Sequence, residues 1–287
     1  MLLRLILLAS SLLTLFLTLG CNAKAVSPTD TNHSQVPTVV MPFVMAGSGS
    51  NLPVTTKLAA AYYLKTGIKI DVPGSIGSDG AINAVKEDSM ELGLISKHLT
   101  AAELATGLKE LPYAQVAVVF GAHRAAPDSN LTDSDIIAII SGSKTTWADG
   151  TPIQVFLRQN NDSSNLVLYD VIPGYKQALI NAYDKQLWQI IYRDSDMSEA
   201  IKDHKGAWGL TVSTEIAKEG VQTKPLAYNG VAPTNENIRN GTYKLTENLS
   251  FIYKEPLSNR AVNFLEYVFS DEGQSILEKW GSSPVRR

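Results

Sequence analysis

From residue 38 onward, short apolar runs alternate with longer segments in which apolar residues recur at helical spacing. Val39 to Met45 is the first such run. After a polar loop, the apolar residues Val54, Leu58 and Tyr62 follow four residues apart, which is typical of one face of a helix. Ile68 to Val72 is a second apolar run, again followed by a helical segment. This order of strand, loop and helix predicts an α/β fold whose sheet is covered on both faces.

Three of the predicted strand-to-helix loops are rich in glycine, hydroxyl and amide residues. They span residues 46–51 (AGSGSN), 74–80 (GSIGSDG) and 158–165 (RQNNDSSN). A helix N-terminus presents free backbone N–H groups to an anion, and Arg158 adds a planar cation with several donors. Glycine and serine are also ordinary turn and cap residues, so a single loop of this kind means little. Three such loops in one chain indicate an oxyanion-binding site.

The overall composition narrows the possible partners and cofactors. The 44% hydrophobic and 18% charged residues are typical of a soluble globular chain long enough for about two domains. With 28 acidic and 25 basic residues the net charge is -3, which leaves no positive excess for a nucleic-acid backbone. The four histidines, at positions 33, 98, 123 and 204, lack the spacing of metal ligands. We therefore expect no nucleic-acid partner, no metal and no cofactor.

The motifs of nucleotide hydrolysis and of nucleophilic catalysis are incomplete. Neither glycine loop has the full G-x-G-x-x-G spacing, and Ser143-Lys144-Thr145 lacks the glycine that precedes the lysine of a P-loop. A G-x-S-x-G elbow is missing too, because Ile76 stands where the first glycine of a motif centred on Ser78 belongs. A serine hydrolase also needs a histidine base, and the sequence places none near Ser78. A binding protein is therefore predicted rather than an enzyme, with a hydrolase as an alternative.

The first twenty residues have the pattern of a targeting segment. Arg4 precedes an apolar run from Leu5 to Leu19, which is shorter than the about 20 residues of a membrane-spanning helix. Cys21 is the only cysteine and follows this run directly, so the segment resembles a bacterial lipoprotein signal with lipidation at Cys21. Such signals usually have leucine three residues before the cysteine and a small residue two before it, whereas Thr18 and Leu19 stand at these positions. A plain signal peptide with an incidental cysteine, or an uncleaved anchor, are the alternatives.

Several segments of the chain resemble the PstS-like phosphate-binding proteins of bacterial ABC transporters. Residues 47–51 and 77–80 are similar to the first two ligand loops of that family. The remaining segments that resemble family motifs, in the family's order, are 92–100 (LGLISKHLT), 139–147 (IISGSKTTW), 229–234 (NGVAPT), 240–243 (NGTY) and 270–274 (SDEGQ). The resemblance covers nearly all of the chain after the targeting segment.

The resemblance implies a type II periplasmic-binding-protein fold, in which two α/β lobes enclose a ligand cleft and the chain crosses between them twice. We expect crossings near residues 116–120 and 224–228. The resulting division is a signal peptide at 1–20, a flexible polar tether at 21–37, lobe 1 at 38–118 and 226–287, and lobe 2 at 119–225.

The resemblance also implies which residues hold the anion. Donors from both lobes would surround it, so that one ligand bridges them and favours closure. These donors are Ser48, Gly49, Ser50 and Ser78 in lobe 1, with Arg158, Ser163 and Ser164 in lobe 2.

Two residues of this implied site depart from the family pattern. Asp162 stands where the family has a hydroxyl, and Ser96 stands where many members have an aspartate that accepts a hydrogen bond from protonated phosphate. Serine lacks the charge with which an aspartate repels sulfate. Asp79 or Asp162 could supply the missing acceptor, although a helix-capping role fits Asp79 equally well.

The function implied by the resemblance is the capture of phosphate, or a related tetrahedral oxyanion, for an ABC permease of the inner membrane. The protein would be a monomer, exported to the periplasm or cell surface and anchored by an N-terminal lipid at Cys21. The altered positions Ser96 and Asp162 keep an alternative open, in which a surface lipoprotein uses the same fold as a sensor or adhesion domain without binding an oxyanion.

Overall fold

The computed structural model describes residues 43–286. The predicted signal peptide, the lipidation site at Cys21 and the tether at 21–37 lie outside the described residues. All described residues belong to one compact unit. Between residues 43 and 286, no helix is both long enough and apolar enough to cross a membrane.

The described chain begins with a strand-loop-helix order. The elements up to the first long strand are β1 (Phe43–Gly47), η1 (Gly49–Asn51), α1 (Leu52–Thr66), β2 (Ile70–Asp71), α2 (Gly77–Lys86), β3 (Leu92–Ile95), α3 (Ala101–Leu104) and β4 (Lys109–His123). Pro53 stands in the first turn of α1, where its missing N–H costs no hydrogen bond, and the helix ends at Gly67 with a φ of 74°.

The middle of the chain forms a second α/β segment. Its elements are β5 (Asn130–Leu131), α4 (Asp133–Ser141), β6 (Gln154–Leu157), α5 (Ser163–Val171), α6 (Tyr175–Asp184), β7 (Gln189–Ile190), α7 (Asp194–Asp203), β8 (Ala207–Val212), α8 (Ser213–Ile216) and β9 (Thr223–Pro225). Thr132 and Asp135 form a capping box at the start of α4, and Asp162 caps α5.

The last part of the chain returns to the first sheet. Its elements are β10 (Ala227–Tyr228), α9 (Asn235–Arg239), β11 (Thr246–Tyr253), α10 (Asn259–Phe269), α11 (Asp271–Lys279) and β12 (Ser283–Pro284). The α/β prediction is confirmed by this order of strands and helices.

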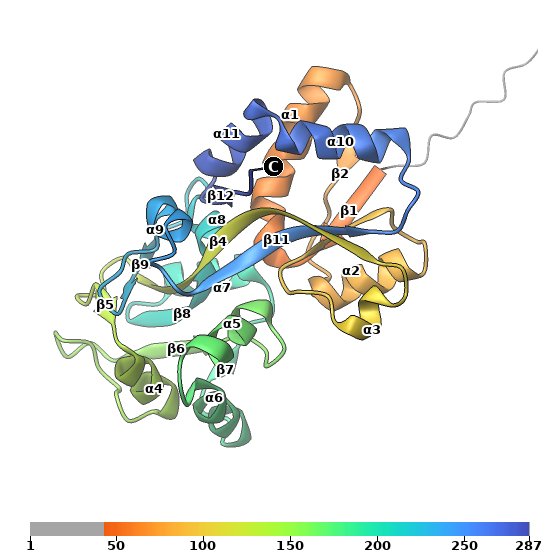
Figure 1. The fold of residues 1–287 in the computed structure, drawn as a ribbon. Helices are drawn as coiled ribbons and strands as arrows, with labels where there is room; N and C mark the ends of the chain where they lie inside the picture. The colour runs from red at the N-terminus through yellow and green to blue at the C-terminus, as the bar shows by residue number, and fades with distance from the viewer. Residues whose placement is uncertain (1–42, 287) are drawn as a thin grey trace, which may run out of the picture. The chain divides into compact units, whose positions relative to one another are not determined.

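Strand β4 joins two sets of parallel strands into one sheet (Figure 1). The strand order is β2-β1-β3-β11-β4-β8-β6-β7, and β9 and β12 also pair with β4. Strands β1, β2 and β3 are mutually parallel, as are β6, β7 and β8. The first part of β4 pairs with β11, and its last part pairs with β8 and β9. The loops that follow β1 and β6 therefore belong to different parallel sets.

Each parallel set has its own hydrophobic core. The first core includes Met45, Leu58 and Phe264, which places it under α1 and α10. The second includes Phe120 and Trp208, whose rings stack 5.5 Å apart. We refer to the segments around these two cores as the first and second lobes.

Residues 226–245 pack with the second core. Leu226, Tyr228 and Leu245 belong to its buried cluster, and the Tyr243 hydroxyl donates to the carbonyl of Val118 over 2.7 Å. The division given above assigns this segment to lobe 1. We propose instead that the chain leaves the second lobe where β11 begins, because the apolar side chains before that strand are buried against the second core.

Candidate functional site

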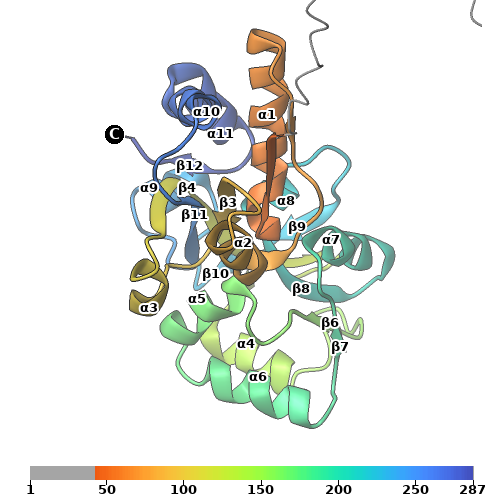
Figure 2. The ribbon, with the colours of Figure 1, turned by 90° about the vertical axis from the view of Figure 1, so that its right-hand side faces the viewer.

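A polar pocket of about 320 Å³ is lined by loops from both lobes. Its walls come from the start of η1, the N-terminal end of α2, the loop between β6 and α5, and the N-terminal end of α7. Figure 2 shows α2 and α5, whose N-terminal residues line this pocket. The lining residues are Ser48, Gly49, Ser50, Ser75, Ile76, Gly77, Ser78, Asp79, Lys97, Arg158, Gln159, Asn161, Asp162, Ser163, Tyr192, Arg193 and Asp194.

The first loop is held in place by a chain of buried hydrogen bonds. The fully buried Asn51 side chain donates to the Ser96 hydroxyl over 2.8 Å, and that hydroxyl donates to Ser48 Oγ over 2.9 Å. Because Ser48 Oγ accepts this bond, its own proton remains available for an acceptor in the pocket. Ser96 does not line the pocket, so its contact with Ser48 makes it a positioning residue.

The N-terminal end of α2 forms the second wall. Ser78 Oγ accepts a hydrogen bond from the backbone N–H of Ser96 over 3.2 Å, which ties this end of α2 to the segment that follows β3. Lys97 also faces the pocket, but its ammonium lies 2.5 Å from Asp79 and 3.7 Å from Glu103. These two carboxylates neutralise much of the positive charge on this wall.

Arg158 is the buried cation of the pocket and is only 5% exposed. Its Nε and Nη2 donate to Asp162 Oδ2 over 3.0 and 2.8 Å, and Nη2 lies 3.3 Å from Asp194 Oδ2. Burial lowers the pKa of Arg158, but the carboxylates of Asp194 and Asp162 outweigh it and raise this pKa above its usual value. The third nitrogen, Nη1, is buried and has no hydrogen-bond partner among the described residues.

Asp194, the first residue of α7, brings a carboxylate from the second lobe against the first loop. A Cβ added to Gly49 would lie 3.1 Å from the Asp194 carboxyl carbon and closer still to its Oδ2. Glycine at position 49 therefore allows this close approach. Burial raises the pKa of Asp194 to about 6, although the Arg158 guanidinium opposes that shift.

Glu247, on β11, is a third buried carboxyl group next to the pocket. It is 4% exposed, and its burial raises the pKa to about 8. The Ser50 and Ser163 side chains face this carboxyl and lower its pKa in part, but neither Glu247 oxygen has a partner with hydrogen-bond geometry. A buried carboxyl without hydrogen bonds is much less costly when protonated.

Seven of the nine residues singled out from the sequence line the same pocket: Ser48, Gly49, Ser50, Ser78, Arg158, Asp162 and Ser163. The other two, Ser96 and Ser164, are buried beside it. The Ser164 N–H donates to Asp162 Oδ1 over 3.1 Å, which is a helix-capping bond.

Sequence reasoning missed Asp194, Asn51 and Glu247 as parts of this site. The sequence holds a signal for Glu247, because this residue alternates with Leu249 and Phe251, which are buried in the first core. An acid at an inward position of a strand points to a buried carboxyl. The sequence holds no such signal for Asp194, because aspartate is an ordinary residue in the first turn of a helix.

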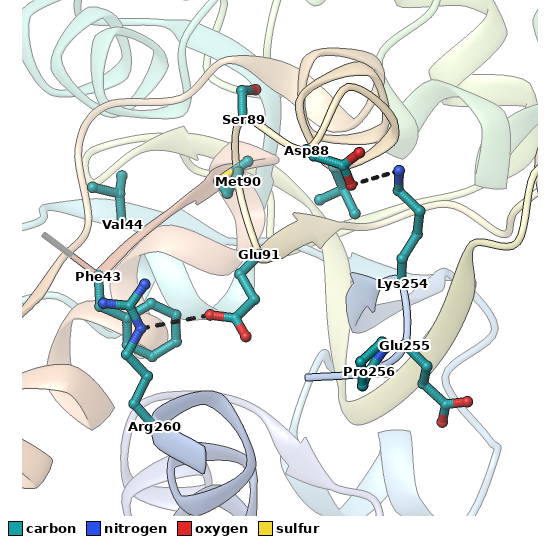
Figure 3. A pocket seen from close by; sticks show the side chains of 11 residues that line it. Phe43, Val44, Asp88, Ser89, Met90, Glu91, Lys254, Glu255, Pro256 and Arg260 are labelled. Carbon is teal, nitrogen blue, oxygen red and sulfur yellow. Dashed lines mark ion pairs between the residues drawn. The ribbon is translucent and has the colours of Figure 1, made fainter. Parts of the chain in front are cut away.

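A larger pocket of about 660 Å³ lies elsewhere, beside β1 and the start of α10 (Figure 3). Four of its charged side chains pair with one another, since Lys254 lies 2.6 Å from Asp88 and Arg260 lies 3.6 Å from Glu91, and the fifth, Glu255, pairs with Lys109. This pocket therefore offers a ligand no buried donor comparable with Nη1 of Arg158. Within residues 43–286, no group of three or more His, Cys, Asp or Glu side chains is arranged to hold a metal ion.

The chain is similar to curated proteins named as phosphate-binding. The chain is 24% identical over 254 residues to the phosphate-binding protein PstS of Borreliella burgdorferi, covering 83% of this chain and 88% of that protein. It is 30% identical over 108 residues to PstS 2 of Streptococcus agalactiae serotype V, covering 37% of this chain and 36% of the relative.

Solved structures show the same fold. A Clostridium perfringens protein assigned as a phosphate ABC transporter substrate-binding protein, with bound phosphate, matches with a TM-score of 0.75 and 25% identity. That match covers 85% of this chain and 100% of the other. An ABC-type phosphate transport receptor from Vibrio cholerae matches with a TM-score of 0.61 and 18% identity, covering 84% of this chain and 99% of the other. The predicted two-lobed, type II periplasmic-binding-protein fold is confirmed by these likenesses. A family model described as the PBP superfamily domain matches residues 25–272, which is most of the chain, and the chain therefore belongs to the PBP superfamily.

Proposed function

We propose that this protein is the solute-binding component of an ABC transporter and captures phosphate, or a related tetrahedral oxyanion, in the pocket between its lobes. The observation that carries this proposal is Nη1 of Arg158, a charged donor that is buried in the pocket wall and has no partner among the described residues. A buried donor without a partner is costly, and a bound oxyanion would satisfy it.

The other donors of the pocket suit the same ligand. Ser48 Oγ has a proton to spare, and the first turns of α2 and α5 present their N-termini beside Ser78 and Ser163. The volume of about 320 Å³ is near the lower end of small-molecule sites, which are about 300–1,000 Å³. Phosphate-binding proteins among the relatives support the choice of ligand.

The remaining parts of the proposal concern partners and location. The family is one of solute-binding proteins that work outside the cytoplasm with an ABC permease. Export by residues 1–20, lipid attachment at Cys21 and a monomeric state complete this proposal. Metabolic labelling with a radioactive fatty acid, with Cys21→Ala as the control, tests the anchor; equal labelling of both proteins would refute it.

Calorimetric titration of the ligand-stripped protein with phosphate, sulfate, molybdate and tungstate tests the ligand. We expect binding of at least one of these oxyanions, and heat from none of them would overturn the proposal and favour the sensor or adhesion alternative. Arg158→Lys keeps a cation beside Asp162 but lacks Nη1, so we expect about a 10- to 100-fold loss of affinity. Arg239→Lys is the matched control, since Arg239 is an exposed residue paired with Glu278.

A further inference from the structure

The cations Lys97, Arg158 and Arg193 that line the pocket are matched by the carboxylates of Asp79, Asp162 and Asp194, so the lining has no positive excess. The Arg158 guanidinium faces the carboxylates of Asp162 and Asp194, so the buried group carries a net negative charge without Glu247. Ionised Glu247 would add a third carboxylate to this group. An oxyanion entering such a site would be repelled by every one of these carboxylates.

Glu247 differs from the two aspartates in its surroundings. Asp162 Oδ2 accepts two bonds from Arg158, and Asp194 Oδ2 accepts one. Both Glu247 oxygens are buried without a hydrogen-bond partner. A buried carboxylate needs such partners, whereas a neutral carboxyl tolerates their absence far better. The surroundings of Glu247 therefore favour its neutral form when no ligand is bound.

The charged groups that act on Glu247 come from the elements around the cleft. Asp162 stands at the start of α5, Asp194 at the start of α7, and Arg158 after β6. On the neighbouring strand β4, Glu110 accepts from the Ser250 hydroxyl farther along β11. Glu247 is thus the group of this set whose charge changes most between pH 7 and pH 9, because its pKa is raised to about 8.

We propose that oxyanion binding to this pocket is coupled to the protonation of Glu247, so that the neutral carboxyl admits the anion and the carboxylate excludes it. This inference rests on the proposed function of the same pocket. The hydroxyls of Ser50 and Ser163, which line the pocket, connect the two groups. Beside a neutral carboxyl they are free to donate to the ligand, whereas a carboxylate draws both protons away from it.

The coupling predicts the direction and the size of the change in apparent oxyanion affinity with pH. If only the protonated form binds, a pKa of about 8 leaves about nine-tenths of the sites competent at pH 7 and about one-tenth at pH 9. Glu247 alone then weakens apparent affinity about tenfold over this range. Asp194, with a pKa of about 6, is ionised throughout it and contributes little. Binding is then accompanied by uptake of about half a proton at Glu247 at pH 8 and of about 0.9 proton at pH 9.

The test compares phosphate affinity at pH 7 and pH 9 for the natural protein and Glu247→Gln, with Glu266→Gln as the control on the exposed side of α10. Phosphate itself titrates over this range, but identically for all three proteins, so the ratio between proteins isolates Glu247. We expect the ratio of dissociation constants at pH 9 and pH 7 to be about tenfold larger for the natural protein and the control than for Glu247→Gln. Equal ratios in all three proteins would overturn the inference.

Calorimetry of the natural protein in two buffers of different ionisation enthalpy gives a second readout, which holds even if Glu247→Gln fails to fold. We expect uptake of about 0.9 proton at pH 9 in excess of the phosphate contribution. Proton release, or affinity that rises with pH, would mean that Glu247 binds the ligand as a carboxylate and would overturn the inference. If the natural protein binds phosphate at neither pH, the proposed function fails first; if it binds with no coupling to Glu247, that function stands and only this inference is lost.

Discussion

Replacing Gly49 with alanine tests whether the contact between the first loop and Asp194 is needed for the binding-competent pocket. The φ of Gly49 lies outside the left-handed region, so alanine imposes no backbone strain at this position. The added methyl group would lie 3.1 Å from the Asp194 carboxyl carbon and overlap Oδ2. The carboxylate must then move away by roughly an ångström to regain ordinary van der Waals distance.

That movement breaks an identifiable interaction. Asp194 Oδ2 already lies 3.3 Å from Nη2 of Arg158, so a further ångström takes it out of hydrogen-bond range. Hydrogen bonds to charged groups contribute about 1.5–3 kcal/mol, which corresponds to about a 10- to 100-fold change in an equilibrium constant. We expect Gly49→Ala to weaken oxyanion binding by about this factor, because the arrangement that brings the lobes together becomes less populated.

Isothermal titration with the preferred oxyanion measures this loss. Gly74→Ala is the matched control, since Gly74 lies in the neighbouring loop and an added Cβ there meets nothing within 4 Å. A double-mutant cycle with Asp194→Ala tests the cause, because removal of the carboxylate leaves room for the methyl group. If Gly49→Ala costs the same affinity with and without Asp194, the clash is not the cause and the reasoning is refuted.

Three further predictions concern stability and positioning. Arg158→Ala leaves the carboxylates of Asp162 and Asp194 buried without their cation, and chemical denaturation at pH 7 should show a loss of about 3–5 kcal/mol; an unchanged midpoint would contradict this. The raised pKa of Glu247, about 8, means that the folded state holds a proton that the unfolded state loses near pH 4.5, so stability falls as pH rises from about 4.5 through 8. Thermal unfolding of ligand-free Glu247→Gln should therefore lose less stability between pH 5 and pH 9 than the natural protein, and parallel curves would refute the assignment. Ser96→Ala removes the bond that orients Ser48, so we expect about a 3- to 10-fold loss of oxyanion affinity, measured by titration, with little change in pH dependence.

Much of the site could be predicted because its donors lie in loops with a local signature. The loop that follows β1 and the loop before α2 contain glycine and hydroxyl residues, and the loop that follows β6 contains Arg158 and amide residues. Arg158 stands out for the same reason, as the only arginine in such a loop. A polar loop between a strand and a helix leads to the free N–H groups of the helix N-terminus. This part of the site can therefore be recognised from neighbouring residues in the sequence.

The rest of the site could not be predicted because it depends on contacts between distant segments. Asp194 reaches Gly49 only because α7 and the first loop meet across the cleft, and nothing near Asp194 in the sequence indicates that meeting. Ser96 stands where a ligand is expected, but its proton goes to Ser48, which only the folded arrangement reveals. The same holds for residues 226–245, whose apolar side chains fit either core by pattern.

The net charge of the protein and of the pocket does not explain how an anion would bind. The chain has a net charge of -3, and three cations and three carboxylates line the pocket, so neither the whole protein nor the pocket attracts an anion by its average field. Affinity must then come from donors at hydrogen-bond distance, such as Ser48 Oγ and Nη1 of Arg158. Interactions of this short range are hardly screened by salt, whereas repulsion from the carboxyls grows with every proton that the pocket or its ligand loses. If Glu247 is coupled to binding as proposed, selection among oxyanions depends on the number of protons that the ligand and Glu247 hold together, and the arginine alone does not decide it.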